Sequence, residues 1–171
     1  MKHKKEAAPM PAMVDPHDLC NNAMLRKAAR RLGKLYDDML APSGLRGTQY
    51  ILLAQIGALG SPSMAELAGS LLMDLSATRH SLGPLIRERL VKVKVDANDR
   101  RIKRVTLTAA GVAKSTEASA LWRQAQDRFE KAFGAARAAN LRQELGAVTS
   151  DGFEAAFSAP INPSDTLVNS H

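Results

Sequence analysis

The sequence has a single cysteine, few aromatic residues and no long apolar run. With only Cys20 present, no disulfide can form within the chain, which is usual for proteins of a reducing compartment. Aromatic residues make up 4% of the chain, so its core must be aliphatic, and this favours helices over a β-sandwich. No stretch approaches about 18 uninterrupted apolar residues and no signal peptide opens the chain. We therefore expect a cytoplasmic protein that does not enter a membrane.

Sequence motifs for catalysis and for metal binding are also missing. The spacing patterns of zinc sites, phosphate-binding loops and nucleophile elbows do not occur, and the four histidines are scattered over His3, His17, His80 and His171. Asp37 and Asp38 are adjacent, and neighbours on a helix point about 100° apart, so they do not form a carboxylate pair. We expect neither an enzyme nor a bound metal or cofactor.

What the sequence does have is an excess of positive charge. Lysine and arginine number 24 against 17 aspartates and glutamates, which gives a formal net charge of +7. Such an excess favours contact with polyanions, meaning nucleic acid or an acidic membrane surface. Charge alone does not identify a partner, because many soluble proteins are basic without binding either one.

Apolar residues recur at spacings of three and four along most of the chain, which is typical of helices that bury one face. They predict helices over about residues 16–40, 47–59, 64–70, 75–89, 109–133 and 136–148. Ser63 and Glu66 form a capping box at the third helix, and Asp74 and Thr108 are N-cap candidates for the fourth and fifth. Pro84 lies inside the fourth helix, where we expect a bend or a local shift in hydrogen bonding.

The periodicity changes to two after the fourth helix. Residues 91–95 alternate valine and lysine, residues 96–101 are rich in turn-forming Asp and Asn, and residues 102–107 form a return strand. This pattern predicts a β-hairpin with charged residues on one face and at its tip. The third and fourth helices, joined by a short turn, predict a helix-turn-helix directly before that hairpin.

A helix-turn-helix beside a basic hairpin favours binding to double-stranded DNA, because the major groove admits one helix. The first turns of the fourth helix offer four candidates for contact with bases, Ser76, Ala77, Arg79 and His80. Arg79 can bond a guanine edge with two hydrogen bonds, Ser76 a base or a phosphate, and Ala77 a thymine methyl group. Ordinary solvated side chains are the alternative for Arg79 and His80. We expect the leucines nearby to be core positions instead, namely Leu72, Leu75, Leu82 and Leu85.

The hairpin tip supplies a second group of basic candidates, Arg100, Arg101 and Lys103. Their charges can neutralise phosphates beside the recognition helix and so provide affinity without reading sequence. An ordinary charged turn is the alternative.

These segments resemble the MarR family of winged-helix transcriptional regulators over about residues 19–148. Residues 25–53 are similar to the family's first two helices, residues 63–93 to its helix-turn-helix, and residues 120–134 to its long helix. Residues 96–111 are similar to its wing, with D-x-R at Asp99 and Arg101 followed by L-T-x-x-G. The resemblance implies that Arg101 enters the minor groove and that Asp99 pairs with and orients an arginine.

The resemblance also implies a fold class and a domain organisation. The fold is mainly α with a small β-hairpin wing, a winged helix-turn-helix plus a helical dimerisation domain. The resemblance implies a dimerisation domain over residues 17–46 and 109–150 and a DNA-binding domain over residues 47–108. Independently of the resemblance, the prolines at both ends of the chain predict a flexible arm over residues 1–16 and a weakly structured tail over residues 151–171. The protein would be a homodimer whose two lobes reach adjacent major grooves of an inverted-repeat operator.

Two positions depart from the family pattern. His80 stands where the family usually has a DNA-contacting arginine, and a shorter side chain can alter sequence preference. Arg89 stands where the family usually has glycine, just before the Leu-Val that opens the wing. If the backbone there has a positive φ, arginine costs about 1 kcal/mol relative to glycine.

Many members of this family release DNA on binding a small aromatic or phenolic compound, and others respond to oxidation of a cysteine near the start of the first helix. Cys20 lies about half a turn too early to match those members, so we expect an inert thiol rather than a redox site. Asn22 and Arg26 are the candidates for holding an aromatic or anionic effector, and an ordinary surface or salt-bridge residue is the alternative for Arg26.

We therefore expect a homodimeric, sequence-specific transcriptional regulator, acting as a repressor that a small-molecule effector releases from DNA. The alternative is a helical dimer that binds DNA without sequence preference, or another protein, and responds to no effector. Strong salt dependence with little specificity would mark that alternative.

Overall fold

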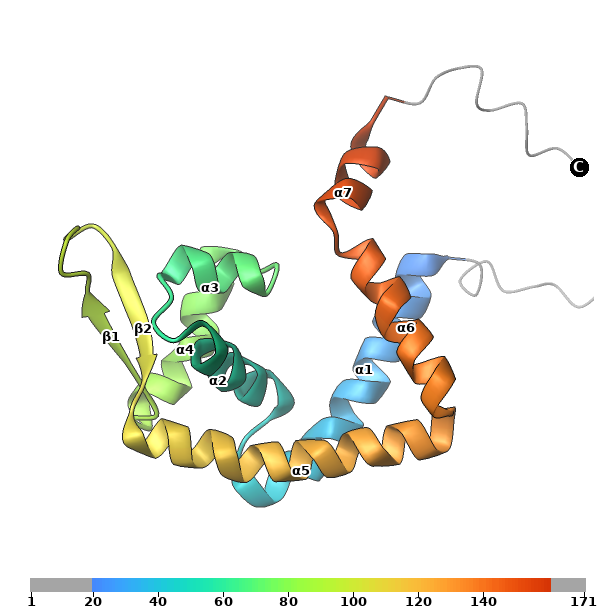
Figure 1. Ribbon diagram of the computed structural model, residues 1–171, viewed down its shortest axis with the longest axis horizontal. Coiled ribbons are helices and arrows are strands. Elements are labelled where there is room, and N and C mark those ends of the chain that lie inside the picture. The colour runs from blue at the N-terminus through green and yellow to red at the C-terminus, as the bar shows by residue number, and fades with distance from the viewer. Residues whose placement is uncertain (1–19, 161–171) are drawn as a thin grey trace, which may run out of the picture. The chain divides into compact units, whose positions relative to one another are not determined.

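The computed structural model describes residues 20–160, so the expected arm over residues 1–16 and the end of the expected tail over residues 161–171 lie outside it. The chain divides into two compact units, with the boundary between Trp122 and Arg123, inside the longest helix. The described residues are mainly helical with one antiparallel hairpin, as the sequence predicts (Figure 1). No helix in this part of the chain is both long and apolar enough to span a bilayer.

The first unit begins with α1 (Asn21–Leu40), which ends in a short 3₁₀ turn (Ala41–Ser43). Only Leu40 of α1 is buried, and much of its predicted apolar stripe is open, with Leu25 40% and Leu35 52% exposed. Across this turn, the Asp37 carboxylate on α1 accepts a hydrogen bond at 2.7 Å from the backbone N–H of Gly47, the first residue of the next helix. This bond helps fix the corner between the two helices.

The core of the first unit gathers around α2 (Gly47–Leu59), which contacts α1, α3 (Met64–Ser70), α4 (Leu75–Arg87) and the hairpin. Leu52, Leu53 and Ile56 of α2 are buried, as the density of apolar residues in this helix predicts, although Ile51 stays half exposed. The other members of this core cluster are aliphatic apart from Tyr50: Leu40, Leu45, Leu67, Leu82, Leu85, Leu90, Val91, Val105 and Ala118. Its largest buried side chains therefore come from the end of α1, α2, the helix-turn-helix and the hairpin together.

Both helices of the helix-turn-helix begin at the caps that the sequence predicts. Ser63 Oγ accepts the N–H of Glu66 at 3.1 Å while the Glu66 carboxylate accepts the N–H of Ser63 at 2.6 Å. Asp74 accepts the N–H of Ala77 at 2.7 Å. These side chains satisfy backbone donors that the first helical turn leaves unpaired, which fixes where α3 and α4 start.

Both helices end in Schellman motifs whose left-handed residue is not glycine. After α3 the N–H of Met73 donates to the carbonyl of Ala68, and after α4 that of Leu90 donates to Leu85. The left-handed residue of each motif is Leu72, with φ 51°, and Arg89, with φ 59°. The positive φ considered for Arg89 is confirmed, and α4 ends at Arg87 rather than at residue 89.

The prediction that four leucines of this region are core positions is half wrong. Leu82 and Leu85 are fully buried, but Leu72 is 69% and Leu75 is 41% exposed. The left-handed turn at Leu72 redirects the chain, so its side chain does not continue the apolar side of α3. Pro84 lies inside α4 without ending it.

The hairpin consists of β1 (Val91–Val95) and β2 (Lys103–Leu107), paired from Val91 with Leu107 to Val95 with Lys103. Figure 1 shows it projecting beyond α3 and α4. Helix α5 (Ala109–Phe133) follows directly, capped by Thr108, whose hydroxyl accepts the N–H of Gly111 at 3.0 Å.

The second unit contains the rest of α5, then α6 (Ala135–Val148) and α7 (Asp151–Ser158). Gly134, with φ 94°, separates α5 from α6, and Arg142 on α6 pairs with Glu130 on α5 at 3.1 Å. Helix α7 corrects the weakly structured tail expected from residue 151. Ser150 caps it by accepting the N–H of Phe153 at 3.2 Å, and Phe153 stacks on Phe157.

Candidate nucleic-acid interface

The exposed face of α4 carries the residues predicted to read bases. Ser76, Arg79 and His80 are exposed and Ala77 is partly exposed, whereas Thr78 between them is buried and donates from its hydroxyl to the carbonyl of Asp74 at 2.8 Å. Within residues 20–160, the side chains of Arg79 and His80 form no hydrogen bond or ion pair. Their donors are therefore available to a partner outside the chain, such as the edge of a base.

The loop between the strands is organised by two aspartates. Asp96 accepts the backbone N–H groups of Asn98 at 2.8 Å and of Asp99 at 3.1 Å. Two main-chain hydrogen bonds then close the loop: the N–H of Asp96 donates to the carbonyl of Ile102, and the N–H of Ile102 donates to the carbonyl of Asp99. Because these bonds fix the backbone, the tip is a shaped turn rather than a free loop.

Arg101 is held at this tip by Asp99. Its backbone N–H, Nε and Nη2 donate to the Asp99 carboxylate at 2.9, 3.1 and 2.8 Å, while its side chain remains 90% exposed. These bonds lower the pKa of Asp99 and raise that of Arg101, so both stay charged. The pairing that the family resemblance implies is thus confirmed, whereas contact of Arg101 with DNA stays a prediction.

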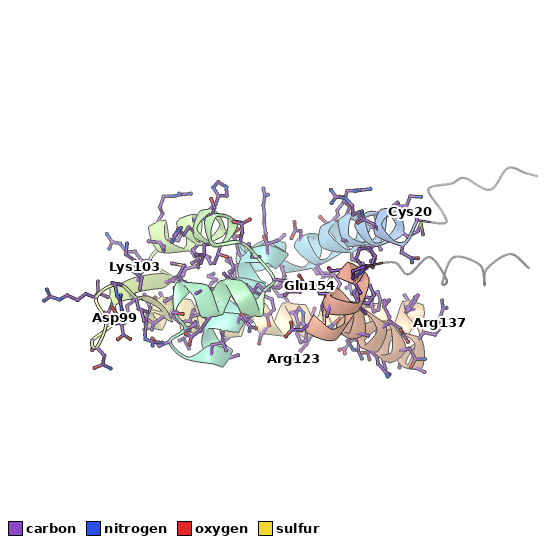
Figure 2. The ribbon with its side chains drawn as sticks, turned by 90° about the horizontal axis from the view of Figure 1, so that it is seen from above. Cys20, Asp99, Lys103, Arg123, Arg137 and Glu154 are labelled. Atoms are coloured by element: carbon purple, nitrogen blue, oxygen red, sulfur yellow. The ribbon has the colours of Figure 1, made fainter. Side chains whose placement is uncertain are left out.

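The other basic candidates of the wing are also exposed. Arg100 precedes Arg101 in the loop and Lys103 opens β2. Figure 2 shows Asp99 and Lys103 at the end of the hairpin, far from Cys20 at the start of α1. Together with Arg79 and His80, these side chains give the first unit two exposed basic groups, one on α4 and one on the wing.

Asp96 and Arg104 form an ion pair at the base of the loop that sequence reasoning missed. Nε of Arg104 donates to the Asp96 carboxylate, and this bond, with the two loop N–H groups, lowers the pKa of Asp96 to about 2. Nη1 of Arg104 donates to the carbonyl of Ser61 at 2.9 Å and lies 3.6 Å from Glu66. For the Asp96–Arg104 pair, the only signal in the sequence is the opposite charge of two residues in the hairpin. The contact between Arg104 and Ser61 has no such signal, because the two residues are far apart in sequence.

The base of the wing is packed tightly against the start of α5. The Thr108 hydroxyl donates to the carbonyl of Arg89 at 2.7 Å, and the Thr108 N–H donates to that of Leu90 at 3.0 Å. A Cβ on Gly111 would lie 2.0 Å from the Leu90 oxygen, so only glycine fits there. The L-T-x-x-G sequence therefore has a structural reason: it joins the end of α4, the base of the wing and the start of α5.

The residues considered for an effector or a redox site lie on α1 and before it. Asn22 and Arg26 are one turn apart on α1, and both are exposed, as is the free thiol of Cys20. No group of three or more metal-binding side chains exists within the described part of the chain. The structure does not gather Asn22 and Arg26 into an enclosed site, and their role stays a prediction.

Known structures of similar fold include bacterial transcriptional regulators. The regulator MosR of M. tuberculosis, in a complex with DNA, is 36% identical with a TM-score of 0.64, and the match covers 77% of this chain and 99% of MosR. A mutant of MarR from E. coli, complexed with operator DNA, is 22% identical with a TM-score of 0.72, covering 80% of this chain and all of MarR. BpsR of Bordetella bronchiseptica is 22% identical with a TM-score of 0.67, covering 75% of this chain and 98% of BpsR.

No protein-family model and no curated protein sequence matches the chain. The family assignment therefore rests on the MosR match, which spans nearly all of that protein at 36% identity, and the 22% matches add the fold alone. The chain has the winged helix-turn-helix of these regulators, and their family is one of regulators and not of enzymes. This chain belongs to the MarR family of winged helix-turn-helix transcriptional regulators.

Proposed function

We propose that this protein is a homodimeric, sequence-specific DNA-binding transcriptional regulator that represses its target genes and is released from DNA by a small-molecule effector. One observation carries the proposal. The first unit presents an unpaired Arg79 on α4 and an Asp99-held Arg101 on the wing, both exposed and cationic. A major-groove reader beside a minor-groove or phosphate contact is the arrangement by which a winged helix binds duplex DNA.

The two groups have different tasks in this proposal. On α4, Arg79 reads a guanine edge, with Ser76, Ala77 and His80 contacting neighbouring bases or phosphates. On the wing, Arg101 enters the minor groove while Arg100 and Lys103 neutralise phosphates. Arg79 therefore contributes to specificity, whereas the wing contributes mainly to affinity.

The exposed apolar face of α1 supports the homodimer. Leu25 and Leu35 lie on the predicted stripe and are 40% and 52% exposed in the single chain. Covering such a stripe removes apolar surface from water, which stabilises association by about 25 cal/mol per Å² before the costs of binding. A two-fold dimer places two recognition helices on half-sites about one helical turn apart, and the operator is then an inverted repeat.

Release by an effector is the finer part of the proposal. The BpsR structure concerns regulation of DNA binding by 6-hydroxynicotinic acid, and that protein shares the fold. For the present chain we propose a small aromatic or anionic effector, with Asn22 and Arg26 as its candidate contacts, acting in the cytoplasm.

The test is selection of bound fragments from a random duplex pool at about 0.15 M salt, where binding to phosphates alone is weak. An enriched inverted repeat is the expected result. The absence of any enriched sequence, with DNA binding that depends steeply on salt, would instead favour the alternative of a dimer that binds DNA without sequence preference.

Two variants, measured on the selected repeat, distinguish the recognition of bases by α4 from the sequence-independent DNA contact of the wing. Arg79→Ala should weaken binding by about 1–3 kcal/mol and relax preference at one base position in each half-site. Arg101→Ala should weaken binding to selected and scrambled duplexes alike and lower the salt slope by about 1. Equal losses on both duplexes for Arg79→Ala would contradict its base-reading role.

A further inference from the structure

Arg104 links the helix-turn-helix to the wing loop. It lies on β2, where its backbone forms a bridge with Ser63, and the next residue, Val105, donates its N–H to Pro62 at 2.8 Å. The main chain of β2 is therefore fixed at the start of α3. From this fixed point the guanidinium donates to the Ser61 carbonyl on one side and to Asp96 on the other.

The contacts continue from Asp96 to the tip of the wing. Asp96 accepts the N–H groups of Asn98 and Asp99, and the Asp99 carboxylate in turn accepts three donors of Arg101. An unbroken series of hydrogen bonds thus runs from the start of α3, through Arg104, Asp96 and Asp99, to the guanidinium of Arg101.

These bonds bear on the position of the wing as well as on stability. The Asp96 side chain is 11% and the Arg104 side chain 37% exposed, so the pair stabilises the fold, although solvent at Arg104 weakens that contribution. An isolated two-stranded hairpin is at best marginally stable in water, so a wing held only by its strand pairs would sample many orientations. Holding a contact group in its bound geometry lowers the entropy that binding must remove.

We propose that Arg104 and Asp96 are positioning residues that hold the wing loop so that Arg101 meets DNA in its bound geometry. The inference rests on the DNA-binding function proposed above. Arg104 does not itself serve as a phosphate contact, because Nε and Nη1 are engaged and the carboxylates of Asp96 and Glu66 offset its charge.

The sharpest test is Asp96→Asn, because charge and positioning predict opposite signs. The substitution removes a negative charge beside a polyanion, so an effect of charge alone would tighten binding. Loss of positioning instead weakens binding, and we expect a loss of about tenfold, the size of one charged hydrogen bond to DNA. Glu88→Gln is the matched control: it removes an exposed negative charge outside this series of bonds and should leave affinity unchanged or slightly higher.

A double-variant cycle shows whether Asp96 acts through Arg101. In an Arg101→Ala background, Asp96→Asn should cause no further loss, because the group that it positions is already gone. Arg104→Lys is the second variant: it keeps the charge but loses the planar fork, and it should weaken binding as Asp96→Asn does. Thermal unfolding of each variant confirms that the fold is intact before binding is measured.

The outcomes separate this inference from the proposed function. Tighter binding by Asp96→Asn, or a second tenfold loss in the Arg101→Ala background, would overturn the positioning role. If Arg101→Ala itself leaves binding unchanged, the proposed role of the wing fails and the positioning role fails with it. If Asp96→Asn alone weakens binding, and the double variant binds DNA as weakly as Arg101→Ala alone, the inference is supported.

Discussion

The close approach of α5 to Leu90 predicts a large loss of stability on substituting Gly111→Ala. The added Cβ would lie 2.0 Å from the Leu90 oxygen, 2.9 Å from its carbonyl carbon and 3.3 Å from its Cα. All three are backbone atoms, so no side-chain rotation can relieve the contact. Either α5 or the chain between α4 and β1 must move.

The size of the loss follows from what that movement breaks. Overpacking of this kind costs about 1–3 kcal/mol. The Leu90 carbonyl also accepts the N–H of Thr108, whose hydroxyl donates to the Arg89 carbonyl, and each such bond contributes about 1 kcal/mol. We expect the free energy of unfolding to fall by about 3–5 kcal/mol, a large part of the roughly 5–15 kcal/mol typical of a folded domain.

Denaturant unfolding followed by circular dichroism measures this loss, at one fixed protein concentration because the proposed dimerisation would stabilise the fold by mass action. Gly69→Ala is the control: Gly69 lies in α3, and a Cβ there would meet nothing within 4 Å. That variant should gain about 0.4–1 kcal/mol. A loss below about 1 kcal/mol for Gly111→Ala would refute the argument, since overpacking alone costs at least that much.

The remaining predictions concern the turns and the wing. Arg89→Gly should raise the free energy of unfolding by about 1 kcal/mol, because φ is 59° there, and a lowered thermal midpoint would contradict this. Ser63→Ala should lower that free energy by about 1 kcal/mol through loss of the α3 cap, and an unchanged denaturant midpoint would speak against the cap. The Arg104 hydrogen bond, together with the N–H groups of Asn98 and Asp99, lowers the pKa of Asp96 from 3.8 to about 2, so Asp96 stabilises the fold above about pH 4 and loses this effect as pH falls toward 2. Asp96→Asn should flatten the stability profile over that interval, and a profile parallel to the unmodified protein would exclude the effect.

Local signals in the sequence predict where most elements begin. Ser63, Asp74 and Thr108 cap their helices as expected, because an N-cap depends on residues only two or three positions apart. The change of period from 3.6 to 2 likewise places the hairpin. These features need no knowledge of the rest of the fold.

Helix ends were harder to predict than helix starts. Glycine is the usual signal for a left-handed residue after a helix, and Leu72 and Arg89 occupy such positions without it. Tertiary packing therefore imposes a backbone conformation that the residue type disfavours. Because no glycine marks the end of α3, the sequence gives no sign that the chain turns at Leu72. Leu72 is therefore predicted as a core position, although its side chain is exposed.

At the candidate site, the sequence predicts pairs that are close along the chain and misses those that are distant. Asp99 and Arg101 are two residues apart in a family motif, and their pairing is as expected. Arg104 reaches Ser61 across 43 positions, a contact that only the folded chain creates. Helix α7 was missed for a different reason, because Ser150 and a short apolar face are weak signals in eight residues.

The ratio of dissociation constants for a scrambled duplex and for the selected inverted repeat, measured at about 0.15 M salt, tests the central claim most directly. If Arg79 on α4 recognises a base and the wing adds affinity without sequence preference, the ratio should be about 10³ or more. Arg79→Ala should then reduce this ratio, and Arg101→Ala should leave it nearly unchanged. A ratio near one, unaffected by Arg79→Ala, would contradict sequence-specific binding by this lobe.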